Sequence, residues 1–367
     1  MKNLRLIGFL MMLASSFLFI NCTSDPIEGP EGSAGIDGID GLDGVDGLDS
    51  TADCRSCHSK EHRDPIKASY LLSVHANETL HTDRGTGMVL TTSEYANRTD
   101  CVMCHTGPGY IDKMNGIPTA IGEGTAAGDP AYPVGALGEN SDHVTAINCK
   151  TCHDSHSSFD FENDGNDFAL RQGFMAVTLD QDPSYAIDMG TSNTCVNCHQ
   201  PRGLPPTSTS GLTLNSRYGP HHGPQSTLLE GIQGAEIAGT TPYPAAKSAT
   251  HRTGSSCVNC HMGATTDGTD GAHTWHPTEN ACLECHESGA PEGVEGYDAN
   301  MAILAGLLEA KGIFNAEKDS FNSVTLPLNE AQAAWNFALL REDRSKGIHN
   351  PDYAKALIAN SIETLQP

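Results

Sequence analysis

The chain has 367 residues, a formal net charge of −25 and only 21 Lys and Arg residues, a balance that argues against nucleic acid and anionic membrane surfaces as electrostatic partners. Hydrophobic residues make up 38% of the chain and aromatic residues 6%, against 38 Gly and 20 Pro, so the side chains alone would form a thin core for this length. The chain also holds 13 Cys and 17 His. We therefore expect a non-protein group to fill part of the interior.

The N-terminus combines a short basic start with an apolar run that ends at a cysteine. Lys2 and Arg5 precede the run Leu6–Ile20, which is too short to span a bilayer and is flanked like a signal peptide. Its end at Cys22 resembles the lipobox of bacterial lipoproteins, in which the thiol is acylated. We expect residues 1–21 to be a lipoprotein signal peptide and Cys22 to anchor the protein to a membrane. The alternative is an ordinary secretory signal with Cys22 incidental.

Residues 22–50 follow as a segment with a three-residue repeat. From Gly29 to Asp49 every third residue is Gly, and the later triplets read Gly-x-Asp. The period is that of a collagen triple helix, but a flexible acidic spacer is the favoured interpretation because the triplets contain a single proline, Pro30. With either interpretation we expect the segment, with its collagen-like Gly-x-y repeat, to act as a lipid-anchored stalk. A trimer, another homo-oligomer or a filament stays open.

Twelve of the 13 cysteines lie in six C-x-x-C-H motifs, the attachment signature of c-type haem. Two thiols must reach the two vinyl groups of one porphyrin while the adjacent His binds the iron, and a zinc or iron–sulfur site would not explain a His after every pair. We expect six haem c groups, whose porphyrins supply the missing apolar core. The first cysteines are Cys54, Cys101, Cys149, Cys195, Cys257 and Cys282; the second are Cys57, Cys104, Cys152, Cys198, Cys260 and Cys285; the histidines are His58, His105, His153, His199, His261 and His286.

Eleven histidines lie outside the motifs, more than six irons need for a second His ligand. His143, His251 and His276 each precede a motif by six residues, and we expect such a ligand to serve a neighbouring haem. His75 lies in an apolar stretch that predicts a helix. The pair His221-His222 should supply one ligand, as should one of His273 and His276, whereas His62 and His81 should be solvated and the methionines should pack rather than ligate. The candidate second ligands are His75, His143, His156, His222, His251, His273 and His349.

Two further segments carry a prediction. Asp160–Gly165 looks like the start of a calcium loop, but Arg171 stands where a bidentate Glu is needed, so only a looser Ca²⁺ site stays open. After the last motif, residues 300–311, 329–344 and 352–365 have helical spacing of apolar residues. We expect a mainly α fold with extensive loops and little sheet, organised around stacked haems. Its hexahaem domain would span residues 51–295, and its C-terminal helices, residues 296–367, would pack on that domain.

The motifs, together with Gly-Pro-His-His-Gly-Pro-Gln and Gly-Ile-His-Asn-Pro-Asp-Tyr-Ala, resemble the multihaem c-type cytochromes of bacterial periplasms and outer surfaces, including the group related to hydroxylamine oxidoreductase and cytochrome c nitrite reductase. The resemblance covers roughly residues 51–367 and implies electron transfer, with His349 as a haem ligand. We expect an electron carrier with bis-His haems, in an outer membrane or cell surface lipoprotein. Its partners would be other redox proteins or an extracellular acceptor. The alternative is a reductase of a small nitrogen or sulfur oxyanion, which needs one open haem.

Overall fold

The computed structural model describes residue 55 and residues 57–76, 79–82, 89–91, 99–116, 145–156, 168–173 and 175–366. The chain divides into two units, Met1–Ser56 and Cys57–Pro367, and all contacts below lie within the second. Cys22, the stalk, Cys54, His143 and the segment Asp160–Gly165 lie outside the described residues. No helix in the described part of the chain is long and apolar enough to cross a membrane.

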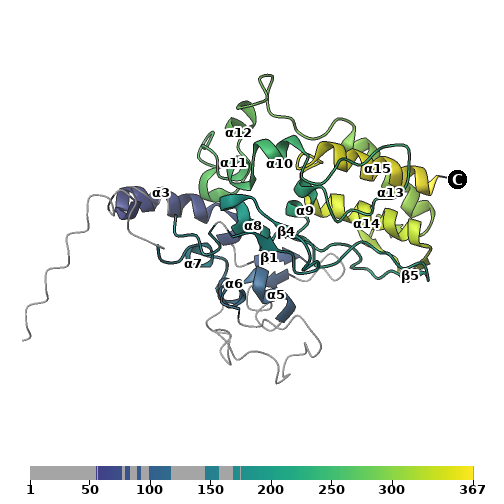
Figure 1. Cartoon of the computed structure of the whole chain (residues 1–367), viewed down its shortest axis with the longest axis horizontal. Helices are drawn as coiled ribbons and strands as arrows, with labels where there is room; N and C mark the ends of the chain where they lie inside the picture. The colour runs from purple at the N-terminus through teal and green to yellow at the C-terminus, as the bar shows by residue number, and fades with distance from the viewer. Residues whose placement is uncertain are drawn as a thin grey trace, which may run out of the picture. The chain divides into compact units, whose positions relative to one another are not determined.

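The described residues are rich in helix and poor in sheet, which confirms the predicted mainly α composition (Figure 1). The strands form antiparallel pairs, β1–β2, β3–β4, β5–β8 and β6–β7. The helices are α3 Lys60–Leu71, α5 Thr99–His105, α6 Gly107–Met114, α7 Cys149–Cys152, α8 Asn193–Val196, α9 Gln225–Glu230, α10 Thr250–Gly254, α11 Cys257–His261, α12 Glu279–Leu283, α13 Tyr297–Ala310, α14 Leu328–Asp343 and α15 Pro351–Leu365; the 3₁₀ turns are η2 Val74–Ala76, η4 Gly190–Ser192 and η5 Ala272–Thr274; and the strands are β1 Thr79–Thr82, β2 Val89–Thr91, β3 Val177–Thr178, β4 Ala186–Ile187, β5 Leu212–Thr213, β6 Phe314–Asn315, β7 Ser320–Phe321 and β8 Thr325–Leu326.

The C-terminal helices form the main hydrophobic core of the described residues. The helices α13, α14 and α15 pack against one another, and α14 is buried along most of its length, including Trp335 and Phe337 (Figure 1). These helices occur where the apolar spacing predicted them. Helix α15 begins with Pro351, and the side chain of Asn350 accepts a hydrogen bond from the N–H of Tyr353, a favourable cap.

The segment before these helices contains short helices joined by loops. The sequence predicted that a helix carries His75, but α3 ends at Leu71 and His75 lies in the following 3₁₀ turn η2. The reason is local: the Ser73 hydroxyl accepts the N–H of Ala76, a hydrogen bond that competes with continued α-helix. The turn still brings His75 inward, because its ring packs 4.7 Å from that of Trp275.

Candidate haem sites

Each C-x-x-C-H motif with well-described backbone forms a single helical turn. In three of them the N–H of the histidine donates to the carbonyl of the first cysteine, at 2.9 Å for His153, 2.9 Å for His199 and 2.8 Å for His286. Such i to i−4 bonding places the first cysteine and the histidine one turn apart on the same side of the helix. Side chains cap three of these turns, because Asn148, Ser256 and Thr278 accept backbone N–H groups at the helix start.

Each of the six motif histidines faces one histidine from outside the motifs. We number these pairs by motif as sites 1 to 6. The pairs, with the distances between their ring centres, are His58–His156 at 6.0 Å, His105–His221 at 6.1 Å, His153–His273 at 6.3 Å, His199–His75 at 6.2 Å, His261–His349 at 6.4 Å and His286–His251 at 6.2 Å.

The spacing of these pairs fits an iron between the rings. Imidazole nitrogens bind metals at about 2 Å, so two histidines on opposite sides of one iron hold their ring centres about 6.3 Å apart. The observed range of 6.0 to 6.4 Å matches this value. The adjacent His221 and His222, by comparison, have ring centres only 4.4 Å apart. The residues present therefore fit a bis-His haem at each of the six motifs.

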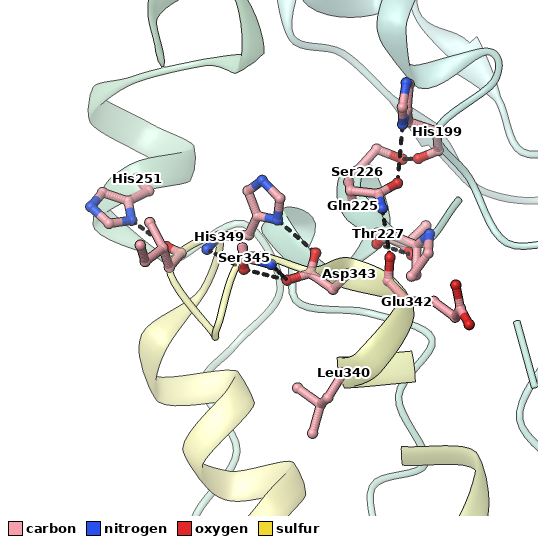
Figure 2. A network of polar contacts seen from close by, with 12 residues as sticks. His199, Gln225, Ser226, Thr227, His251, Leu340, Glu342, Asp343, Ser345 and His349 are labelled. Atoms are coloured by element: carbon pink, nitrogen blue, oxygen red, sulfur yellow. Dashed lines mark hydrogen bonds and ion pairs between the residues drawn. The ribbon is translucent and has the colours of Figure 1, made fainter. Parts of the chain in front are cut away.

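Hydrogen bonds at Nδ1 orient five of the paired histidines. The Nδ1 atom of His153 lies 2.7 Å from the Phe168 carbonyl, that of His261 2.8 Å from the Trp275 carbonyl and that of His251 2.5 Å from the Ile348 carbonyl. His199 contacts Oε1 of Gln225 at 3.1 Å, and His349 contacts Oδ1 of Asp343 at 2.6 Å (Figure 2). Because these acceptors require the proton on Nδ1, the lone pair lies on Nε2, where a metal can bind it.

Burial lowers the pKa of four of the paired histidines and so favours their neutral form. It is the main cause that lowers the pKa of His75 to about 4, with the nearby His199 as a second cause. Burial likewise lowers the pKa of His199, His261 and His273 below the ordinary histidine value. For His349 burial also acts to lower the pKa, but the charge and hydrogen bond of Asp343 outweigh it, so the pKa is raised. Neutral imidazole is the form that binds metal.

The structure assigns the adjacent histidines of the Pro-His-His-Gly segment differently from the sequence prediction. His221 faces His105, whereas Nδ1 of His222 lies 2.6 Å from a carboxylate oxygen of Glu342. His221 has a left-handed backbone with a φ of 69°, and a Cβ on Gly223 would lie 2.5 Å from the Gln200 carbonyl. The tight loop therefore fixes which of the two rings turns toward the motif. The second-ligand candidate of this pair becomes His221 in place of His222.

The remaining predicted ligands divide into two groups. His75, His156, His251, His273 and His349 each face a motif histidine. The candidate ligands near a motif in the sequence face a different motif, since His156 follows motif 3 and faces His58, and His251 precedes motif 5 and faces His286. His143 lies outside the described residues, so its role as a second ligand stays a prediction.

The six sites adjoin one another through shared residues. The side chains of Cys104 and Cys198 lie next to each other and bring sites 2 and 4 together, and those of Cys195 and Cys257 bring sites 4 and 5 together. His156 lies three residues after His153, which connects sites 1 and 3. The ligand shells of sites 5 and 6 meet at consecutive residues, because Ile348 contacts His251 and is followed by His349.

Trp275 links three of these sites, a role that sequence reasoning missed. Its ring centre lies 4.7 Å from His75 of site 4 and 5.4 Å from His273 of site 3, and its carbonyl accepts Nδ1–H of His261 in site 5. It holds a left-handed backbone with a φ of 55°, which is uncommon for a large residue. The sequence signal was Trp275 itself, one of two tryptophans, between His273 and His276. Site 4 thus adjoins sites 2, 3 and 5.

A match to a protein-family model agrees with a cytochrome. Residues 44–210, less than half of the chain, match the family model described as outer membrane cytochrome MtrC/MtrF-like, domains II/IV. Together with the six motifs, this match supports a multihaem c-type cytochrome. No curated protein matches the chain. The crystal structure of the outer cell wall cytochrome OcwA aligns with a TM-score of 0.47 and 18% identity, over 82% of this chain and 50% of OcwA, so the chain spans about half the length of that protein.

Proposed function

We propose that this protein carries electrons through six covalently bound haems, each with its iron between two histidines. The observation that carries the proposal is the facing of every motif histidine by one further histidine at 6.0 to 6.4 Å. When bound, haem supplies reversible one-electron exchange at its iron. Each haem would be held by the motif cysteines and histidine from one side and by the second histidine from the other.

The protein's own contribution is to fix the ligands and to keep the sites close together. Nδ1 hydrogen bonds to rigid backbone carbonyls hold the rings of His153, His251 and His261 in one orientation, which strengthens imidazole as a ligand. The contacts between sites form a connected series, sites 1, 3, 4, 5 and 6 in order, with site 2 adjoining site 4. Such contiguity supports transfer from site to site within one chain.

The six pairs favour a carrier over a reductase. A reductase of a small oxyanion needs one iron with an open position for its substrate, so one motif histidine would have no histidine opposite it. Each motif histidine here has such a partner, including His58 and His286 of the first and last motifs. With the second ligand bound at every iron, no position is left for a substrate.

The cell surface is the proposed place of action. The family match to an outer membrane cytochrome supports it, as does the lipobox-like end of the apolar run at Cys22. Acyl chains on Cys22 would hold the protein at the membrane, and the net charge of −25 would favour cationic partners. The partners we propose are other redox proteins and an extracellular electron acceptor.

A reductive titration tests this function. The purified, haem-loaded protein is reduced stepwise with dithionite under argon and then mixed with a soluble ferric chelate in a stopped-flow spectrometer. We expect six electrons per chain and complete reoxidation by the chelate. Fewer than six electrons, or reoxidation by nitrite or hydroxylamine with turnover while the ferric chelate leaves the protein reduced, would contradict the proposal.

A further inference from the structure

The C-terminal end of α14 and the connection to α15 supply contacts to the ligand shells of three sites (Figure 2). The Glu342 carbonyl accepts a hydrogen bond from Gln225, whose Oε1 contacts His199 of site 4. Asp343 contacts His349 of site 5, and the Ile348 carbonyl contacts His251 of site 6. One short segment therefore contacts histidines of three neighbouring sites, so the chemistry of its contacts can be compared from site to site.

The three contacts differ in charge. His199 meets a neutral side-chain amide and His251 a neutral backbone carbonyl, but His349 meets the carboxylate of Asp343. The carbonyls of Phe168 and Trp275, which contact His153 and His261, are neutral as well. Among these five Nδ1 contacts of paired histidines, the one at site 5 alone involves a formal charge.

The carboxylate of Asp343 is held away from water. Its side chain has 0% exposure. One oxygen contacts His349, and the other accepts both the N–H and the hydroxyl of Ser345. A charge in such a place is screened little by solvent, so it acts strongly on groups beside it.

A buried carboxylate on the far nitrogen of an iron ligand acts in two ways. Its hydrogen bond makes the imidazole a stronger electron donor to the metal. Its negative charge also stabilises the oxidised iron, which carries one more positive charge than the reduced iron. Both effects favour the oxidised state and therefore lower the reduction potential.

We propose that Asp343 tunes the haem of site 5 to a more negative potential than a neutral acceptor at the same place would give. This inference rests on the proposed function, since it takes His349 as the second ligand of that haem. Asp343 acts through His349 and is a tuning residue rather than a ligand. Because site 5 adjoins sites 4 and 6, its potential sets how readily an electron moves between them.

The test compares Asp343→Asn with Asp298→Asn in the full, haem-loaded chain. The first change keeps the shape and removes the buried charge; the second removes the same charge from an exposed carboxylate paired with Lys346 in the adjoining segment. Potentials are measured by spectroelectrochemical titration, and haem content by pyridine haemochrome absorbance. We expect one of the six one-electron steps to shift to a more positive potential in Asp343→Asn and none in Asp298→Asn. Unshifted steps in Asp343→Asn, or equal shifts in both variants, overturn the inference.

A second variant guards against loss of folding in Asp343→Asn. Ser345→Ala removes the hydroxyl that donates to the Asp343 carboxylate, so the carboxylate interacts more strongly with His349 and the same step should shift to a more negative potential. A shift in the positive direction or no shift overturns the inference. The proposed function is judged separately, because fewer than six haems or a high-spin haem in the unaltered protein would contradict it whatever the variants do.

Discussion

Asn336 forms hydrogen bonds that connect α14 and α15 to the loop at Ala235. Its replacement by Ala should lower the free energy of unfolding markedly. Its side chain lies on α14 with 0% exposure. It accepts the N–H of Ala235 at 2.8 Å and donates to the Ala235 carbonyl at 2.9 Å and to the Ser361 hydroxyl on α15 at 3.0 Å. One residue thus joins α14, α15 and the segment at Ala235.

The expected size of the effect follows from these contacts. Each buried hydrogen bond contributes about 1 kcal/mol net, and a buried polar group left without a partner costs about 1–3 kcal/mol. Asn336→Ala removes three bonds and leaves the N–H of Ala235 without this partner, while the Ala235 carbonyl still accepts the N–H of Ile237, so we expect a loss of about 3–5 kcal/mol. Urea unfolding of the haem-loaded protein, followed by far-ultraviolet circular dichroism, measures it.

Asn322→Ala is the matched control. Asn322 makes an exposed side-chain bond to the Gly312 carbonyl at 2.9 Å, so its loss should cost less than about 1 kcal/mol. Equal losses in the two variants would show that the cross-ties of Asn336 do not stabilise the C-terminal helices and would refute the reasoning.

Three further predictions concern single residues. His221→Ala should create one high-spin haem seen by electron paramagnetic resonance, because His221 faces His105, while His222→Ala should leave all haems low-spin; the reverse pattern would favour His222 as the ligand. Trp275→Leu should alter the low-spin signals of two haems, since the ring packs on His75 and His273; an unchanged spectrum would show that the ring does not position these ligands. Cys22→Ala should release the protein from the membrane fraction, and unchanged membrane partitioning would rule out the lipid anchor.

The sequence predicts the structural features that depend on residues close together in the chain. A C-x-x-C-H motif closes on itself in one helical turn, and the apolar spacing near Trp335 is enough to predict α14. The facing of His75 by His199, by contrast, joins segments far apart in the sequence and depends on tertiary packing. The sequence shows which histidines are available as second ligands, but not which motif each of them faces.

The choice between His221 and His222 marks a second limit. Adjacent residues have the same local sequence, so composition and spacing could not separate them. The left-handed backbone at His221 and the contact of His222 with Glu342 on α14 favour His221. The same holds for Asp343, whose role depends on the chain reversal that brings His349 back beside the end of α14.

If all six irons are saturated by two histidines, as we propose, the reduced protein has no open position for carbon monoxide, and a binding experiment tests this. Electron paramagnetic resonance of the oxidised protein is recorded first, and the visible spectrum of the reduced protein is compared before and after addition of the gas. We expect low-spin electron paramagnetic resonance signals from all six haems and no change in the visible spectrum on addition of carbon monoxide. A high-spin signal together with a shift on carbon monoxide binding would show an open haem, contradict the account and favour a reductase.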